Sequence, residues 1–254
     1  MNPPAALRSV RIDNVLLTEV SLMSTYAPAL AASDTPVLRL AAGRGRTRII
    51  AAALAISAAV VAAVLLFRPW QVRNSFAYAE LAPVRDAIWT AIFIDALAFV
   101  TVAISLALSV ALAARTRGSR LANVGAFITI AGSVLFAMGA FAFVALVWLV
   151  TDTAVLPAAD GARVLDAALT EMAHVVAPQA LGFLLYTVGT LLLAVALFRS
   201  RAVPRWLPIA IVVATLLQFA AHDRALDFVQ IGAMALWIVL AGFLFVREPS
   251  EAVS

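Results

Sequence analysis

One carboxylate, Asp95, lies within the otherwise uncharged apolar stretch 87–114. A charge deep in a bilayer costs roughly 2.5–3.5 kcal/mol on insertion scales, so such a side chain is expected to face protein or water. Asp95 could bind a proton or cation in a polar cavity open to the outside. Alternatively, it packs the bundle as a neutral or hydrogen-bonded acid. The candidate hydrogen-bond partners are Thr90, Gln179, Gln218 and Gln230. The sequence leaves both roles open.

The two histidines and their acidic neighbours form a second candidate group. Glu171 lies one helical turn before His174, and Asp223 directly follows His222. If the two chain segments meet, imidazoles and carboxylates could bind zinc or another divalent cation. A Glu-x-x-His pair is nevertheless common by chance, and the catalytic His-Glu-x-x-His pattern is absent from the sequence. A polar outer loop is the more ordinary interpretation.

Other chemistry is excluded by residue type. The chain has no cysteine, which rules out thiolate nucleophiles, thiolate metal sites and disulfides. It has no Walker loop, no Gly-x-Ser-x-Gly and no dinucleotide fingerprint, so no cofactor is expected. The net charge of +4 does not indicate nucleic-acid binding, because the arginines form short clusters between apolar stretches, where they set membrane topology.

Apolar stretches long enough to cross a bilayer must position these residues. The chain is 64% hydrophobic and 13% charged, against about 45–50% and about 25% in soluble domains. About 20 apolar residues span a hydrocarbon core as a helix, the form in which backbone groups bond within their own segment. The sequence predicts an all-α, polytopic membrane protein, a six-helix antiparallel bundle. Its spans are 49–67, 87–114, 121–151, 175–198, 206–221 and 228–246. Because 206–221 is short, a re-entrant segment is its alternative.

Arginine counts predict the orientation. The segments flanking the spans on one side carry ten arginines, and those on the other side carry five. The positive-inside rule places the richer side, and with it both termini, in the cytoplasm. The predicted location is the cytoplasmic membrane. The outer segment 160–174 is amphipathic and is expected to lie in the interface as a short helix, with Asp160 as its cap.

The chain ends are expected to be tails. Residues 1–48 contain four prolines and no long apolar run, which predicts a disordered cytoplasmic tail. Residues 247–254 form a second cytoplasmic tail. Met23 is an alternative start, because Thr18-Glu19-Val20 could be encoded by a ribosome-binding stretch. Residues 1–22 would then be a leader that the native protein lacks.

Glycines recur every seven residues on two of the predicted helices. They are Gly125, Gly132 and Gly139 on one helix and Gly182 and Gly189 on another. Small residues allow membrane helices to approach closely, where van der Waals contact replaces a hydrophobic driving force. Packing within the molecule is favoured over a dimer interface, and the oligomeric state is left open.

One segment carries a resemblance. Leu197-Phe-Arg-Ser-Arg-Ala-Val-Pro-Arg-Trp-Leu-Pro208, after Gly182-Phe-Leu-Leu-Tyr-Thr-Val-Gly189, resembles a recurring segment of uncharacterised multi-spanning membrane proteins from GC-rich actinobacteria. In those proteins an arginine-rich cytoplasmic turn joins the fourth and fifth helices. The resemblance implies a membrane-embedded helical fold and transfers no catalytic residue.

Three functions follow in order. The first is a non-enzymatic, membrane-embedded accessory or regulatory protein, whose partners are the lipid bilayer and another membrane protein. The second is a small proton- or cation-linked transporter or permeation protein that uses Asp95. The third is a membrane enzyme with an outward-facing metal site at Glu171, His174, His222 and Asp223.

Overall fold

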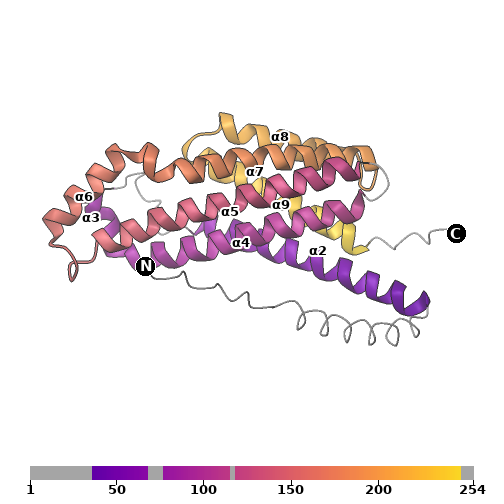
Figure 1. Cartoon of the computed structure of the whole chain (residues 1–254), viewed down its shortest axis with the longest axis horizontal. Coiled ribbons are helices and arrows are strands. Elements are labelled where there is room, and N and C mark those ends of the chain that lie inside the picture. Colours follow the sequence, from indigo (N-terminus) through magenta and orange to yellow (C-terminus); the bar gives the residue numbers. More distant parts are fainter. Residues whose placement is uncertain (1–35, 68–76, 115–117, 247–254) are drawn as a thin grey trace, which may run out of the picture. The chain divides into compact units, whose positions relative to one another are not determined.

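The computed structural model describes residues 36–67, 77–114 and 118–246, without the side chains of 36–44, 172–176 and 223–224. Every regular element in these ranges is helical, which confirms the predicted all-α fold (Figure 1). The elements are α2 (Pro36–Leu66), α3 (Tyr78–Leu81), the 3₁₀ helix η1 (Ala82–Val84), α4 (Arg85–Ala113), α5 (Ser119–Val150), α6 (Ala158–Thr170), α7 (Met172–Ser200), α8 (Trp206–Ala220) and α9 (Asp223–Val246).

Five helical stretches are long and apolar enough to cross a membrane. They are Gly45–Leu66, Tyr78–Ala113, Ser119–Val150, Ala177–Ser200 and Ala225–Val246. The sixth, α8, is apolar but has only 15 residues, a length of about 22 Å against a hydrocarbon core of about 30 Å. The described fold therefore has five or six helices able to span a bilayer, with α8 the shortest, as the sequence indicated.

The first helix starts earlier than predicted. It begins at Pro36 instead of Ile49, so residues 36–48, assigned from the sequence to a disordered tail, are helical. Proline is well tolerated at a first helical position, and the leucines and alanines that follow favour a helix. The chain divides into two compact units, Met1–Gly45 and Arg46–Ser254. The rest of the predicted N-terminal tail, the alternative start at Met23 and the predicted tail 247–254 lie outside the described residues.

The outer amphipathic segment also differs in detail from the prediction. The predicted single helix over 160–174 is two helices, because α6 ends at Thr170 and α7 begins at Met172. Asp160 does not cap α6; it lies in the first turn, after the N-cap residue Pro157. A carboxylate there still favours the helix through the macrodipole.

The main core of the second unit joins side chains from α2, α4, α5, α7, α8 and α9. Its largest fully buried members are Leu54, Leu106, Leu193, Leu197, Leu207, Ile211 and Leu240. In a bilayer the lipid chains are as apolar as these residues, so close packing supplies the attraction between helices. The α5–α7 pair has the most extensive backbone contact, followed by α4–α5.

A smaller core lies where α3, η1 and α6 meet the N-terminal end of α4 and the C-terminal end of α5. Leu81, Ile88, Val147 and Leu165 are buried in it. Gly161 on α6 fits against the carbonyl oxygen of Val150, with the Tyr78 ring 3.0 Å from the position of an added Cβ. This cluster fixes α6 to the end of the bundle.

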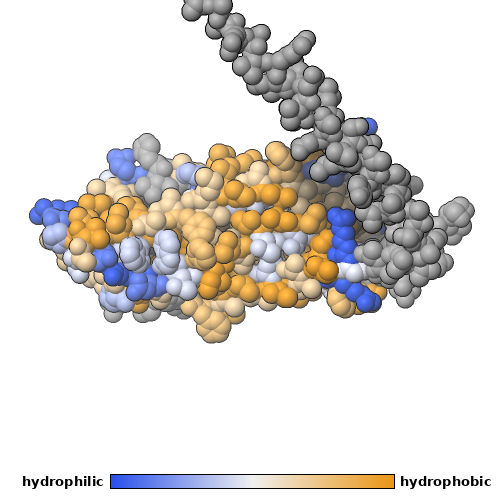
Figure 2. Space-filling model, turned by 60° about the horizontal axis from the view of Figure 1, so that its bottom comes forward, coloured by the Kyte–Doolittle hydropathy of each residue, from blue (hydrophilic) through white to orange (hydrophobic). Residues whose placement is uncertain are grey.

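The surface of the bundle is apolar over its middle. Figure 2 shows hydrophobic residues across the central part of one face and hydrophilic ones gathered toward its two ends. Large apolar side chains are well exposed, for example Phe127 at 75% and Phe228 at 67%. Exposed to water, such area costs about 25 cal/mol per Å². Lipid is therefore the solvent that suits this surface.

Candidate functional site in the polar interior of the bundle

Asp95 lies on the inward stripe of α4. Its neighbours at helical spacing, Ile88, Phe99, Val102 and Leu106, are all buried, and residues three, four and seven apart share one helix face. The Asp95 side chain is half-buried, and its Oδ1 atom is fully buried. The sequence could not decide whether this carboxylate faced lipid or protein. The structure turns it toward the protein.

Aromatic contacts fix what lies beside Asp95. The ring of Phe93 is 5.5 Å from that of Phe141, and the ring of Phe99 is 4.9 Å from that of Phe136. These two pairs bracket Asp95, so the segment 136–141 of α5 runs past it. Within this segment, Gly139 contacts Gln179 of α7. The helix register therefore brings Gln179 to the depth of Asp95.

The other expected partners of Asp95 are placed on three helices. Thr90 is exposed, and its hydroxyl donates to the backbone oxygen of Asp86 at 2.8 Å. Gln218 and Gln230 are half-buried on α8 and α9. Among the four residues, Gln179 is the one whose backbone contact with α5 fixes its level along the bundle.

A polar cluster lies next to Asp95 along the same core. The Phe99 ring, one turn after Asp95, is 4.6 Å from the ring of Tyr186 on α7. The Tyr186 hydroxyl lies beside Thr190 of α7 and Trp237 of α9. All three residues are buried, at 5%, 1% and 3% exposure. Their polar atoms make no full hydrogen bond with any described residue.

Short hydroxyl side chains elsewhere in the core behave differently. Ser57, Ser133 and Thr215 donate to backbone oxygens of their own helices at 2.6, 2.8 and 2.7 Å. Serine and threonine reach the carbonyl of the preceding turn in this way. Tyrosine and tryptophan side chains carry their polar atoms too far from the backbone for that. The Tyr186–Thr190–Trp237 cluster is therefore a polar spot whose hydrogen-bonding capacity is unused by the described residues.

The residues predicted to bind metal are placed in part. Glu171 is exposed between α6 and α7, and His222 is exposed before α9, with its Nδ1 atom 3.1 Å from the carbonyl oxygen of Ala220. His174 lies in the first turn of α7 and Asp223 opens α9, but their side chains are outside the description. Among the described side chains, no group of three histidines or carboxylates could hold a metal ion. The metal site stays a prediction.

The glycines predicted to support packing lie at the α5–α7 contact. A Cβ added at Gly132 would lie 2.7 Å from the Gly182 carbonyl oxygen, and one at Gly182 would lie 2.7 Å from that of Gly132. Gly125 faces Gly189 in the same way, at 3.1 Å, and Gly139 faces Gln179. Backbone meets backbone along this line, so the two helices form a rigid pair beside Asp95 and Tyr186.

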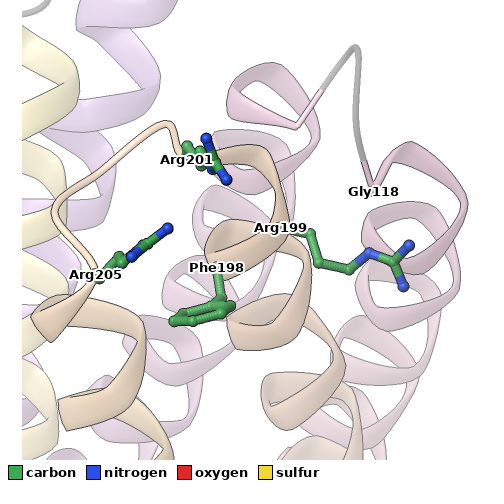
Figure 3. A pocket seen from close by; sticks show the side chains of 5 residues that line it. All are labelled: Gly118, Phe198, Arg199, Arg201 and Arg205. Carbon is green, nitrogen blue, oxygen red and sulfur yellow. The ribbon is translucent and has the colours of Figure 1, made fainter.

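A cavity of about 530 Å³ lies at the turn between α7 and α8. Its lining residues are Gly118, Phe198, Arg199, Arg201 and Arg205 (Figure 3). Sequence reasoning used these three arginines only to orient the spans. Their density in a seven-residue turn was the available signal for a binding site.

The fold and this interior define the class of the protein: an all-helical, multi-pass membrane protein with a polar core. The sequence matches the model of the family described as Domain of unknown function (DUF4386) over residues 49–248, and the chain belongs to that family. This match confirms the prediction of an uncharacterised membrane protein family. No curated protein and no solved structure matches the chain.

Proposed function

We propose that this chain is a small proton- or cation-linked protein of the cytoplasmic membrane, a transporter or permeation protein in which Asp95 is the ionisable site. Both termini are proposed to be cytoplasmic, on the strength of the ten arginines against five. The observation that carries the proposal is the burial of Asp95 Oδ1 on the inward stripe of α4. An intramembrane carboxylate that faces the bundle interior is typical of proton and ion pathways.

The surroundings of Asp95 support this function over the accessory role that the sequence put first. A purely packing carboxylate needs only a nearby donor. Here Asp95 is followed by Phe99, which contacts Tyr186, whose hydroxyl lies beside Thr190 and Trp237. A chain of polar groups separated by less than two helical turns offers relay positions for a proton or water.

The test combines titration and flux in proteoliposomes. Carboxylate infrared spectra of wild type and Asp95→Asn are recorded across the neutral pH range, and proton or cation flux is followed with an entrapped dye. We expect a titrating carboxylate band that disappears in Asp95→Asn, together with a pH-dependent flux that is lost. The matched control is Asp166→Asn, the same substitution at an exposed position of α6.

Two results would contradict the proposal. One is a flux that is the same in wild type and Asp95→Asn. The other is an Asp95 band that does not titrate. Either would make Asp95 a packing residue, and the accessory or regulatory function would then lead. Capture of a membrane protein partner would be the experiment to follow.

A further inference from the structure

We propose that the cavity at the α7–α8 turn binds a phosphate group, either on the headgroup of an anionic phospholipid or as a soluble phosphate. This site is distinct from Asp95. Three of the five residues that line the cavity are arginines, Arg199, Arg201 and Arg205. Guanidinium groups match phosphate oxygens with paired N–H donors and stay charged at all working pH values.

The arginines are not neutralised by described neighbours. The ion pairs among the described residues involve Arg85 and Arg163. No described carboxylate lies within ion-pair distance of Arg199, Arg201 or Arg205. Figure 3 shows Arg201 and Arg205 on the turn with Phe198 below them, and Arg199 extending to the side where Gly118 lies. Like charges held around one cavity repel each other, and a bound anion removes that repulsion.

The backbone adds to the positive potential. Gly118, which lines the cavity, is the N-cap residue of α5 and has no side-chain cap. Its φ of 92° is in the left-handed region, and an added Cβ would lie 3.2 Å from the Ala196 carbonyl oxygen, so glycine suits this position. The positive end of the α5 dipole therefore forms one wall of the cavity.

The turn itself holds Arg201 in an unusual conformation. Arg201 is the one non-glycine residue with positive φ, 54°, among the described residues. Glycine or asparagine commonly takes this left-handed position after a helix. An arginine there keeps its guanidinium at the cavity at the expense of backbone strain. Strained backbone held in place by the surrounding structure is a recurrent property of binding sites.

The apolar wall suits the rest of a lipid. Phe198 lines the cavity and is 44% exposed, and Trp206, the first residue of α8, is 53% exposed. Its ring meets that of Phe243 at 6.4 Å. Aromatic residues at the ends of spans lie at headgroup depth. A phosphate bound here would have an acyl region at its side, which favours the lipid over the soluble source.

The experiment measures both ligands with the full chain. Wild type is reconstituted in phosphatidylcholine vesicles with and without phosphatidylglycerol, and retained lipid is quantified after extraction by native mass spectrometry. Binding of inorganic phosphate to delipidated protein is measured by calorimetry in a neutral detergent. The triple variant Arg199→Gln, Arg201→Gly, Arg205→Gln should bind about a hundredfold more weakly, since each basic side chain near the surface contributes several-fold.

Two further variants keep the test sharp. Arg201→Gly alone removes one charge from a position where glycine is favoured, so it should fold and bind several-fold more weakly. The control Arg163→Gln, an exposed arginine on α6 paired with Asp160, should bind as wild type does. Circular dichroism checks helix content in every variant.

The outcomes separate the two sources. Retention of phosphatidylglycerol that inorganic phosphate does not displace supports the proposal with the lipid as ligand. Phosphate binding that the triple variant loses, without preference for phosphatidylglycerol, supports it with the soluble ion as ligand. Equal binding of both probes by wild type and the arginine variants would overturn it, as would no binding of either probe to wild type.

Discussion

At the scale of single residues, Arg85 connects the elements at the α6 end of the bundle. Its Nη1 atom is 3.1 Å from Asp152 Oδ1 and donates to the Thr151 carbonyl oxygen at 3.3 Å. Its guanidinium lies 5.4 Å from the Trp148 ring centre. Trp148 in turn donates from Nε1 to Asp86 at 2.9 Å. One arginine thus joins the start of α4 to the end of α5, a role that a count of charges could not reveal.

Asp152 should make stability depend on acid. The Ala154 backbone N–H, at 3.0 Å, and then the Arg85 guanidinium hold the pKa of Asp152 below its ordinary value of 3.8. A lowered folded pKa gives stability that is fully present above the unfolded pKa and lost as pH falls through the folded one. The difference in melting temperature between wild type and Asp152→Asn should stay constant from about pH 7 to about pH 5 and shrink below about pH 4.

Thermal melts in detergent across this pH range check that prediction. Asp166→Asn, on the exposed face of α6, is the control and should melt like wild type throughout. A wild-type advantage over Asp152→Asn that persisted unchanged at the lowest pH would contradict it.

Tyr186 offers a second residue-scale prediction. Its hydroxyl is buried without a full hydrogen bond to any described residue, and a buried unpaired polar group costs about 1–3 kcal/mol. Tyr186→Phe should therefore keep or raise the melting temperature, while Trp237→Ala, which opens a cavity, should lower it. A clear loss of stability in Tyr186→Phe would show instead that the hydroxyl has a bound partner, such as water. Chemical denaturation in detergent gives both values.

At the scale of elements, the α5–α7 pair depends on backbone approach. Gly132→Ala places a methyl group under 3.0 Å from backbone atoms of Gly182 and Leu185. Backbone cannot rotate away as a side chain can, so the helices must separate, at a cost of about 1–3 kcal/mol or more. We expect a lower melting temperature and faster hydrogen exchange in both helices.

Glycines on α9 supply the matched control. A Cβ at Gly232 or Gly242 meets nothing within 4 Å among the described atoms. Gly232→Ala should be neutral or stabilise by up to about 1 kcal/mol, because alanine favours a helix more than glycine does. Equal effects of Gly132→Ala and Gly232→Ala on the melting temperature would refute close backbone packing as the role of Gly132.

At the scale of the whole molecule, the absence of cysteine makes topology directly testable. With both termini cytoplasmic, a cysteine introduced as Ser250→Cys should react with an impermeant maleimide only after cells are permeabilised. Ala167→Cys, exposed on α6, should react in intact cells. The reverse labelling pattern would invert the proposed orientation, and labelling of both in intact cells would mean an odd number of crossings.

The sequence by itself determined that this is a helical membrane protein. Long uncharged stretches cannot be solvated by water, and backbone groups in lipid must bond within a helix, so the spans could be located to within a few residues except at α2. Glycine spacing likewise marked one face on each of α5 and α7. These inferences need only local pattern, and for that reason composition and periodicity were enough.

Only the tertiary structure decided how these faces combine. Which glycine meets which, whether Asp95 faces protein or lipid, and that three topology-setting arginines surround a cavity all depend on contacts between helices far apart in the chain. Arg85 shows the same limit, since its partners Thr151 and Asp152 lie on another element. Side-chain packing between helices sets their register and rotation, and neither quantity is written in the pattern of a single span.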